Sequence, residues 1–427
     1  MHRTFCVALA LLGLPGAHAY SVLTHEAIID SAWEHDLKPL LVARFPQATP
    51  EDLLHAHAFA YAGCIIQDMG YYPFGSKFFS DLVHYVRSGD FVVNLIAQSQ
   101  DLDEYAFALG ALAHYAADNE GHRIAVNPSV AIEYPKLERK YGSVVTYAEN
   151  PSAHLKTEFG FDVLQVARGR YAPQAYHDFI GFEVSKPVLE RAFRDTYSLQ
   201  LEDVFNDTDL ALGTYRRTVS TVIPEMTRVA WRVKKKDLQK ADPGITRRKF
   251  TYNLSRASYH KEWNRTYQKP GVGTFFLSIL FRIVPKVGPF KAAGFKIPNR
   301  QTEGLFEQSF DRTLDFYRTL LAGAGRQNLA LENRDFDTGA PTRAAEYQLA
   351  DRAYSRLAIK LAEKDPSTVD LKVVANVLGF YGNLNAPYAT KRDPQQWQQT
   401  TQALAKLRTE PASPKPPAAP ESALPAR

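Results

Sequence analysis

Histidine and carboxylate residues recur at helical spacing in the first part of the chain. His114, Asp118 and His122 are four residues apart in succession, and His154 and Glu158 make another step of four. Residues four apart on a helix lie on the same face about 5–6 Å from each other, so their side chains can share one ion or bridge two. Imidazole nitrogen and carboxylate oxygen are the ligands that zinc accepts where thiolates are absent. The spacing therefore predicts a zinc site built on helices.

Three more candidate ligands precede these steps, namely His25, Asp68 and His84. A single histidine or aspartate on a helix is more often a solvated or hydrogen-bonded residue than a ligand, so none of them carries weight alone. Together, however, five of the twelve histidines occupy positions that are linked to a carboxylate in the sequence. This joint pattern favours a metal centre over a set of unrelated polar residues.

Helices are expected to position these side chains, because the surrounding apolar residues follow helical periodicity. The pattern covers residues 24–33 and 102–117, and it returns over residues 306–321 and 342–364, where it stops before Pro366. The sequence has no sustained alternation of apolar and polar residues with hairpin turns, and no glycine-rich strand-to-helix fingerprint. The predicted fold class is therefore all-α.

The first nineteen residues have the pattern of a secretory signal peptide. An apolar run over residues 5–14 follows a positively charged start, and small residues occupy positions 17–19. The run is too short for a membrane span, which needs about 20 apolar residues, so cleavage before Tyr20 and a secreted or periplasmic location are expected. Cleavage would remove Cys6 and leave Cys64 as the only cysteine, so the mature chain could form no internal disulfide.

The full ligand series resembles that of the zinc-dependent phospholipases C and the related glycosylphosphatidylinositol-specific phospholipases D, and more distantly that of the single-strand-specific zinc nucleases. The resemblance covers residues 20 to about 165, and it implies their multi-helix fold, here with a C-terminal helical extension, and about three zinc ions. It assigns one zinc to Asp68, His84, His114 and Asp118, a second to His122, His154 and Glu158, and a third to Tyr20, His25 and Asp118. Tyr20 would contribute its free amine and carbonyl, and Asp118 would bridge two ions.

Two positions depart from the family pattern. Tyr20 stands where many members have tryptophan. The four-residue step from Asp118 to His122 matches the phospholipase D-like branch, whereas the better-known phospholipases C and the nucleases have a longer step. No residue matches the family's choline-binding pocket. The resemblance therefore implies the metal site, but neither the headgroup of the substrate nor the P–O bond that is cleaved.

Metal ions a few ångströms apart suit the hydrolysis of a phosphodiester. They lower the pKa of a bound water, hold the phosphoryl oxygens and neutralise charge on the leaving alkoxide. The resemblance suggests that Asp68 could also take a proton from the attacking water, and it leaves a role as a ligand alone open. The expected function is that of an exported zinc-dependent hydrolase that acts on phospholipids, with Asp68 and Asp118 as its catalytic carboxylates.

A basic span keeps a single-strand-specific zinc nuclease as the alternative. Residues 216–269 carry clusters of lysine and arginine with aromatic residues between them, an arrangement that suits single-stranded nucleic acid. Such charge runs are more often solvated helix faces or lipid-headgroup patches. The formal net charge is +5, or +4 once Arg3 is removed, which does not argue for nucleic acid by itself. A second alternative is a non-catalytic helical module that zinc stabilises.

An apolar run over residues 271–285 follows the basic span. It is too short to cross a bilayer comfortably. Its large apolar residues could enter a lipid interface beside the flanking lysines, or they could form a buried helix of the core. The residues expected to contact the membrane are Phe275, Phe276, Leu280 and Phe281.

The expected organisation has five parts. They are the signal peptide (1–19), a catalytic helical domain (20–232), a basic and apolar insert (233–300), helical segments that complete the body (301–408), and a disordered tail rich in proline and alanine (409–427). Asp337-Thr338-Gly339 matches the tripeptide of aspartic proteases. It occurs once, and the sequence lacks the paired β-rich halves of those enzymes, so a loop is predicted there.

Overall fold

A computed structural model describes residues 22–168, 181–219, 231, 234–240, 243–247 and 294–409. Within these ranges the chain is helical, and the strands are limited to one antiparallel pair, β1 (Arg334–Asp335) and β2 (Ala340–Pro341). The predicted all-α fold class is therefore confirmed. The predicted signal peptide, the predicted ligand Tyr20 and the residues beyond 409 lie outside the described residues.

The helices before residue 220 include short 3₁₀ and π turns, which are labelled η. They are α2 (Val22–Ala32), η1 (Trp33–Leu37), α3 (Lys38–Arg44), α4 (Pro50–Gly63), η2 (Ile66–Tyr71), α5 (Lys77–Tyr85), α6 (Ser88–Ala97), α7 (Leu102–Gly121), η3 (His122–Val126), α8 (Asn127–Glu133), α9 (Pro135–Tyr141), α10 (Pro151–Arg168), α12 (Lys186–Tyr197), η4 (Leu201–Asp203) and α13 (Thr208–Arg217). The C-terminal part contains α18 (Arg300–Gly325), α19 (Gln348–Ala362), η7 (Pro366–Thr368), α20 (Leu371–Phe380), η8 (Ala389–Arg392) and α21 (Pro394–Thr409).

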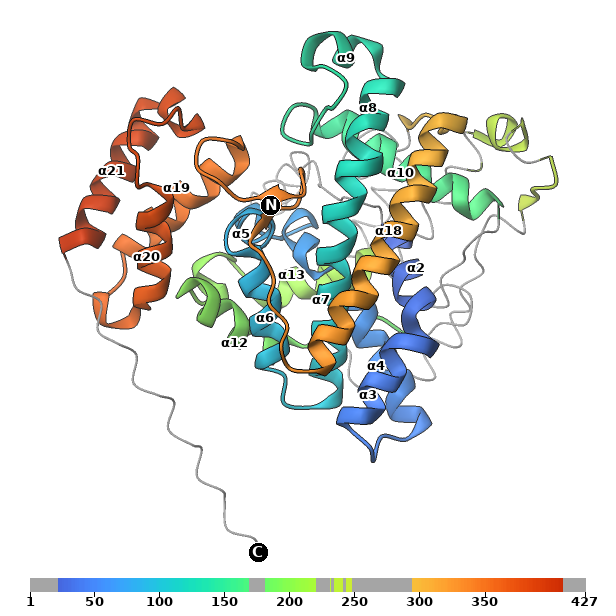
Figure 1. Cartoon of the computed structure of the whole chain (residues 1–427), viewed down its shortest axis with the longest axis horizontal. Coiled ribbons are helices and arrows are strands. Elements are labelled where there is room, and N and C mark those ends of the chain that lie inside the picture. Colours follow the sequence, from blue (N-terminus) through green and yellow to red (C-terminus); the bar gives the residue numbers. More distant parts are fainter. Residues whose placement is uncertain are drawn as a thin grey trace, which may run out of the picture.

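Helix α7 is the central element of the fold (Figure 1). Its N-cap residue Asp101 accepts a hydrogen bond of 2.8 Å from the backbone N–H of Glu104, as helix caps do. Nearly all of its residues are buried, since α2, α4, α6 and α18 pack around it. A helix that is apolar on most sides is expected at the centre of a core. The polar side chains of α7, His114, Asp118 and Asn119 among them, are therefore buried among closely packed helices.

Helices α4 and α7 approach each other backbone to backbone. A Cβ atom on Gly63 would lie 2.0 Å from the carbonyl oxygen of Phe107, and one on Gly110 would lie 2.2 Å from the carbonyl oxygen of Ala60. Only glycine fits at such a crossing. The contact brings the C-terminal end of α4, with the buried Cys64, against the middle of α7.

Two helix boundaries differ from the sequence-based prediction. The helix expected over residues 102–117 continues to Gly121, where a π turn begins with His122. The helix expected over residues 342–364 begins only at Gln348. The residues between β2 and Gln348 form a loop with a turn instead. Only the first of them, Thr342, still pairs with the hairpin, where its backbone N–H donates to the carbonyl of Asn333 over 2.9 Å.

Helices α19, α20 and α21 form a small bundle with an aromatic core of its own (Figure 1). The rings of Tyr354 and Phe380 stack 3.7 Å apart, and those of Tyr388 and Trp397 stack 5.5 Å apart. The bundle rests on α5, where the guanidinium carbon of Arg356 lies 4.1 Å from the centre of the Phe78 ring.

None of the helices in the described ranges combines the length and the apolar character that a membrane span requires. The predicted membrane-contact residues Phe275, Phe276, Leu280 and Phe281 lie outside the described residues. The same holds for four aromatic residues of the basic span, namely Tyr252, Tyr259, Trp263 and Tyr267.

Candidate metal centre

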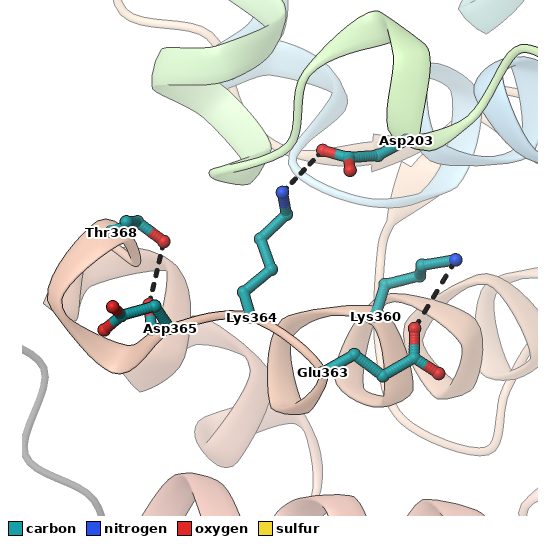
Figure 2. A pocket seen from close by; sticks show the side chains of 6 residues that line it. All are labelled: Asp203, Lys360, Glu363, Lys364, Asp365 and Thr368. Carbon is teal, nitrogen blue, oxygen red and sulfur yellow. Dashed lines mark hydrogen bonds and ion pairs between the residues drawn. The ribbon is translucent and has the colours of Figure 1, made fainter.

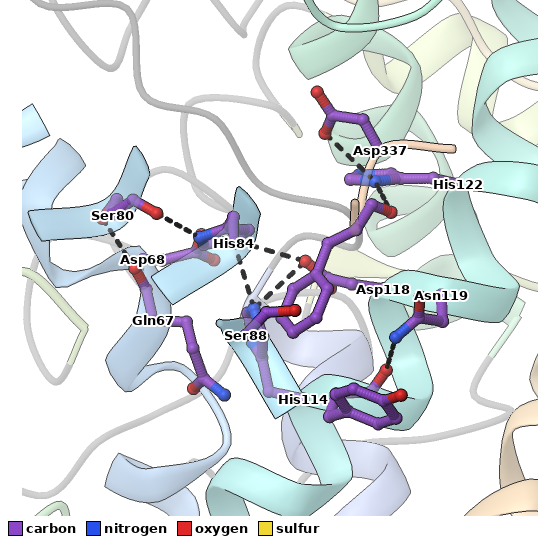
Figure 3. A network of polar contacts seen from close by, with 12 residues as sticks. Gln67, Asp68, Ser80, His84, Ser88, His114, Asp118, Asn119, His122 and Asp337 are labelled. Atoms are coloured by element: carbon purple, nitrogen blue, oxygen red, sulfur yellow. Dashed lines mark hydrogen bonds and ion pairs between the residues drawn. The ribbon is translucent and has the colours of Figure 1, made fainter. Parts of the chain in front are cut away.

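All predicted zinc ligands except Tyr20 lie in the described part of the chain, and the fold brings them together. Figure 3 shows five of them: Asp68, His84, His114, Asp118 and His122. They form three groups within which the ligand atoms lie at most 4.8 Å apart. Two groups share His114, and we call their residues the Asp118 cluster: His25, Asp68, His84, His114 and Asp118. The third group is the Glu158 cluster: His122, His154 and Glu158.

Six elements supply the ligands of the Asp118 cluster and the Glu158 cluster. His25 comes from α2, Asp68 from η2 and His84 from α5, while α7 supplies both His114 and Asp118. The Glu158 cluster uses η3, which continues α7, and α10. The four-residue steps predicted from the sequence thus lie on α7 and α10. The remaining ligands reach the site only through the packing of α2, α5 and η2.

Hydrogen bonds fix which nitrogen of each imidazole faces the Asp118 cluster. Nδ1 of His84 donates to the carbonyl of Ser80 over 2.8 Å, and Nδ1 of His114 donates to the carbonyl of Cys64 over 3.0 Å. Each Nε2 therefore presents a lone pair to the cluster. These two Nε2 atoms lie only 3.4 Å apart, an approach that a shared cation stabilises.

The carboxylate of Asp118 divides its two oxygens between neighbouring groups. Oδ2 lies 3.1 Å from Nε2 of His114 and 3.4 Å from Nε2 of His84, while Oδ1 lies 3.6 Å from Nε2 of His25. In the neutral imidazoles of His114 and His84 the Nε2 atoms carry no proton, so in that state these contacts are not hydrogen bonds. Neither Asp118 oxygen makes a hydrogen bond of good geometry in the described ranges. A fully buried carboxylate without donors is costly unless a cation compensates it.

Electrostatics in the Asp118 cluster favour ionised carboxylates. Burial alone would raise the pKa of Asp118, but the adjacent imidazoles of His114 and His84 hold it well below its usual range. Burial likewise opposes the protonation of His84, yet the carboxylates of Asp118 and Asp68 outweigh it and raise the pKa of His84 to about 10. The negative charge thus attracts a cation, which a proton supplies when no metal is bound.

The Glu158 cluster is equally buried. Oε1 of Glu158 lies 2.8 Å from Nε2 of His154 and 3.5 Å from Nε2 of His122. Burial raises the pKa of Glu158 well above its usual range, and the charges of Asp68 and Asp118 add to this effect. Burial also lowers the pKa of His154 far below its usual value. A divalent cation would stabilise the ionised form of Glu158, and a neutral His154 keeps a lone pair for it. The Glu158 cluster therefore suits a metal ion.

The start of α2 is tied to the same helix as the Glu158 cluster. Asp162, four residues after Glu158 on α10, accepts hydrogen bonds from the backbone N–H groups of Leu23 (3.0 Å) and Thr24 (3.1 Å). It thereby caps α2 from a distant part of the chain. The ring of His25 then stacks on that of His114, with centres 4.6 Å apart.

The sequence analysis missed the contribution of the β1–β2 hairpin. Its turn contains Asp337-Thr338-Gly339, so the predicted loop is present, and the structure places it beside the Glu158 cluster. Nδ1 of His122 lies 2.9 Å from the carbonyl oxygen of Phe336 and 3.3 Å from Oδ1 of Asp337 (Figure 3). No periodic signal links residues that are 214 positions apart.

Other polar features in the described ranges lie apart from these clusters. A surface pocket between η4 and the end of α19 is lined by Asp203, Lys360, Glu363, Lys364, Asp365 and Thr368 (Figure 2). Its lysines face acids, since Lys364 lies 2.7 Å from Asp203 and Lys360 lies 3.5 Å from Glu363. At the start of the basic span, Arg216 is paired with Glu183. Neither feature forms an anion site of unpaired cations.

The donor set fits zinc. Each group combines imidazole nitrogen with carboxylate oxygen, which is the ligand chemistry of zinc sites without thiolates. Buried atoms of the clusters that make no hydrogen bond in the described ranges include Nδ1 of His154, Nε2 of His122 and both oxygens of Glu158. Orphaned buried polar atoms of this kind are expected where a ligand completes the site.

One comparison with known proteins, the match to a family model, agrees with this chemistry. A search of curated proteins and a search of solved structures each gave no significant match. The family model described as zinc dependent phospholipase C matches residues 24–207. This range contains every predicted ligand in the described part of the chain, and it ends before α18 and the β1–β2 hairpin. Residues 24–207 of this chain therefore belong to the zinc-dependent phospholipase C family.

Proposed function

We propose that the protein is an exported phosphodiesterase that hydrolyses phospholipids with about three zinc ions. The observation that carries this proposal is the gathering of eight predicted ligands, from six separate elements, into groups no wider than 4.8 Å. A site that served stability alone would need only one ion with four protein ligands. Linked groups of imidazoles and carboxylates suit a hydrolase better.

Zinc bound in these groups would supply Lewis acidity and a water of lowered pKa. The Asp118 cluster would hold two ions, because the two oxygens of Asp118 face different histidines. The Glu158 cluster would hold the other. Asp118 would thus hold neighbouring cations, and zinc there would polarise the phosphoryl group of a phosphodiester.

Asp68 is the candidate for moving a proton. It is fully buried, and its Oδ1 lies 3.4 Å from Nε2 of His84. We propose that its carboxylate is a ligand that also accepts the proton of the attacking water. An Asp68→Asn variant that retains its metal but loses the acid limb of its pH–rate profile would support the proton-accepting role.

Export and the N-terminal ligand form one part of the proposal. The backbone N–H of Leu23 donates a hydrogen bond to Asp162, which fixes Leu23. Tyr20 precedes it by three residues, which a chain can span over at most about 11 Å. Only a free amine at Tyr20 can act as a ligand, since a peptide nitrogen has no available lone pair. Chains that start at Tyr20 should therefore hold one more zinc than chains that start at Ala19, and equal zinc contents would exclude Tyr20 as a ligand.

The substrate class is tested with a panel of phosphodiesters. The mature protein should hydrolyse phospholipids, in vesicles and as short-chain monomers, faster than single-stranded DNA or RNA. The Asp118→Asn variant, purified in the same way, measures the background hydrolysis that contaminating enzymes cause. Faster cleavage of nucleic acid would favour the nuclease alternative. Zinc binding without any hydrolysis would favour a zinc-stabilised module.

A further inference from the structure

The β1–β2 hairpin lies against ligands of both clusters. The ring of Phe336 packs edge-on against that of His84, with centres 5.3 Å apart, and lies tilted against that of His114, with centres 6.1 Å apart. Its backbone N–H donates to the carbonyl of His84 over 3.3 Å, and its carbonyl accepts from Nδ1 of His122 over 2.9 Å. A segment outside residues 24–207 thus covers the site.

Asp337 is the charged part of this contact. It is 1% exposed. The hydroxyls of Tyr85 and Tyr347 both donate to its Oδ2, the first over 3.0 Å. Its other oxygen, Oδ1, lies 3.3 Å from Nδ1 of His122. The two phenols thus occupy one oxygen and leave the second for the imidazole N–H.

Anchors on either side fix the position of this carboxylate. Asn127 donates to the carbonyl oxygen of Asp337 over 2.6 Å, and Asp335 accepts from the backbone N–H of Asp337 over 3.0 Å. Gly339 adopts a positive φ of 70°, and a Cβ there would lie 2.6 Å from the carbonyl oxygen of Asn119 on α7. The turn can approach α7 this closely only with glycine at that position.

We propose that Asp337 is a positioning residue for the Glu158 cluster, which rests on the proposal that this cluster binds zinc. The Phe336 carbonyl accepts the Nδ1 proton of His122, and the Asp337 carboxylate faces the same nitrogen over 3.3 Å, so both favour the tautomer whose Nε2 lone pair points toward Glu158. The buried negative charge also makes Nε2 a stronger donor to a cation. Asp337 itself lies on the Nδ1 side of the ring, away from the metal-facing nitrogen.

The test compares zinc binding by the full mature chain and its Asp337→Asn and Asp337→Ala variants. Losing such a partner typically weakens metal affinity by about 10- to 100-fold. We expect Asp337→Ala to lower the affinity for one zinc by that factor, with a smaller loss for Asp337→Asn, which keeps an acceptor but not the charge. Competition with a chelator measures the affinity. The absorption spectrum of the cobalt-substituted protein reports the ligand geometry independently of activity.

Asp351→Asn is the matched control, because Asp351 is a buried carboxylate that accepts backbone N–H groups of Ala345 and Ala389, far from the ligands in the sequence. It should retain wild-type zinc affinity and cobalt spectrum. If Asp337→Ala does not fold, the isosteric Asp337→Asn variant decides. If the folded Asp337 variants keep the wild-type zinc affinity and cobalt spectrum, the inference is overturned, while the proposed function is not affected. A wild-type protein that binds no zinc would overturn both the inference and the proposed function.

Discussion

The Asp118 cluster and the Glu158 cluster are oriented by different parts of the chain. In the Asp118 cluster, His84 and His114 donate to carbonyls of Ser80 and Cys64, which lie within residues 24–207. In the Glu158 cluster, His122 donates to the hairpin at Phe336. Residues 24–207, which match the family model, therefore contain all the described ligands, but the orientation of His122 also depends on the hairpin outside this range.

Asp118→Asn should cause the largest loss of activity. The substitution keeps the size of the side chain but removes the negative charge that faces His25 in one group and His84 in the other. We expect kcat/KM for a short-chain phospholipid to fall by about 1000-fold or more, which corresponds to roughly 4 kcal/mol. His25→Ala affects one group only and should cost less. Equal losses for the two variants would argue against a bridging role.

Gly110→Ala should break the packing that supports the Asp118 cluster. The new Cβ would lie 2.2 Å from the carbonyl oxygen of Ala60, so α4 must move away from α7 and take the Cys64 carbonyl with it. We expect a loss of about 3 kcal/mol in the free energy of unfolding, measured by urea denaturation. Gly213→Ala on α13 is the control, because no atom lies within 4 Å of its Cβ position. A similar loss in both variants would contradict this account.

Glu133 should make the region beside the Glu158 cluster sensitive to pH. Burial raises the pKa of this carboxyl from its ordinary value of 4.5 to about 7. The folded protein therefore holds this proton more tightly than the unfolded chain does, and stability falls as the pH rises between these two values. We expect Glu133→Gln to be more stable than the wild type by roughly 2 kcal/mol at about pH 8 and to differ little below about pH 4.5.

Urea denaturation of both proteins across this pH range measures the difference. Glu133 is close to the Glu158 cluster, because its Oε2 accepts a hydrogen bond of 3.2 Å from the hydroxyl of Thr157, the residue before Glu158. Parallel pH dependences of the wild type and the variant would show that Glu133 does not titrate in this range.

Thr49→Ala should have the smallest effect. Thr49 and Asp52 form a capping box at the start of α4, at the opposite end of the helix from Cys64. Loss of such a cap costs about 1 kcal/mol. The melting temperature should therefore fall slightly while the zinc content stays at the wild-type value. A loss of zinc would mean that the whole of α4, and not only its glycine contact with α7, orients the Asp118 cluster.

Periodicity in the sequence was enough to predict the helical class and the ligands on α7 and α10, because both depend on local spacing. The boundary at Gly121 was missed, since the π turn that begins at His122 has no signature in apolar periodicity. The hairpin was missed for a related reason. Strands of two residues cannot display alternation, and the residues that Asp337 contacts, Tyr85 and His122 among them, are far away in the sequence.

The zinc content of the mature protein tests the central claim most directly. Metal analysis of protein purified without chelators should find about three zinc ions per chain in the wild type. Glu158→Gln should lose about one, and Asp118→Asn should lose more than one because its carboxylate faces two groups. A wild-type protein without zinc, or an Asp118→Asn variant with the wild-type content, would contradict the account.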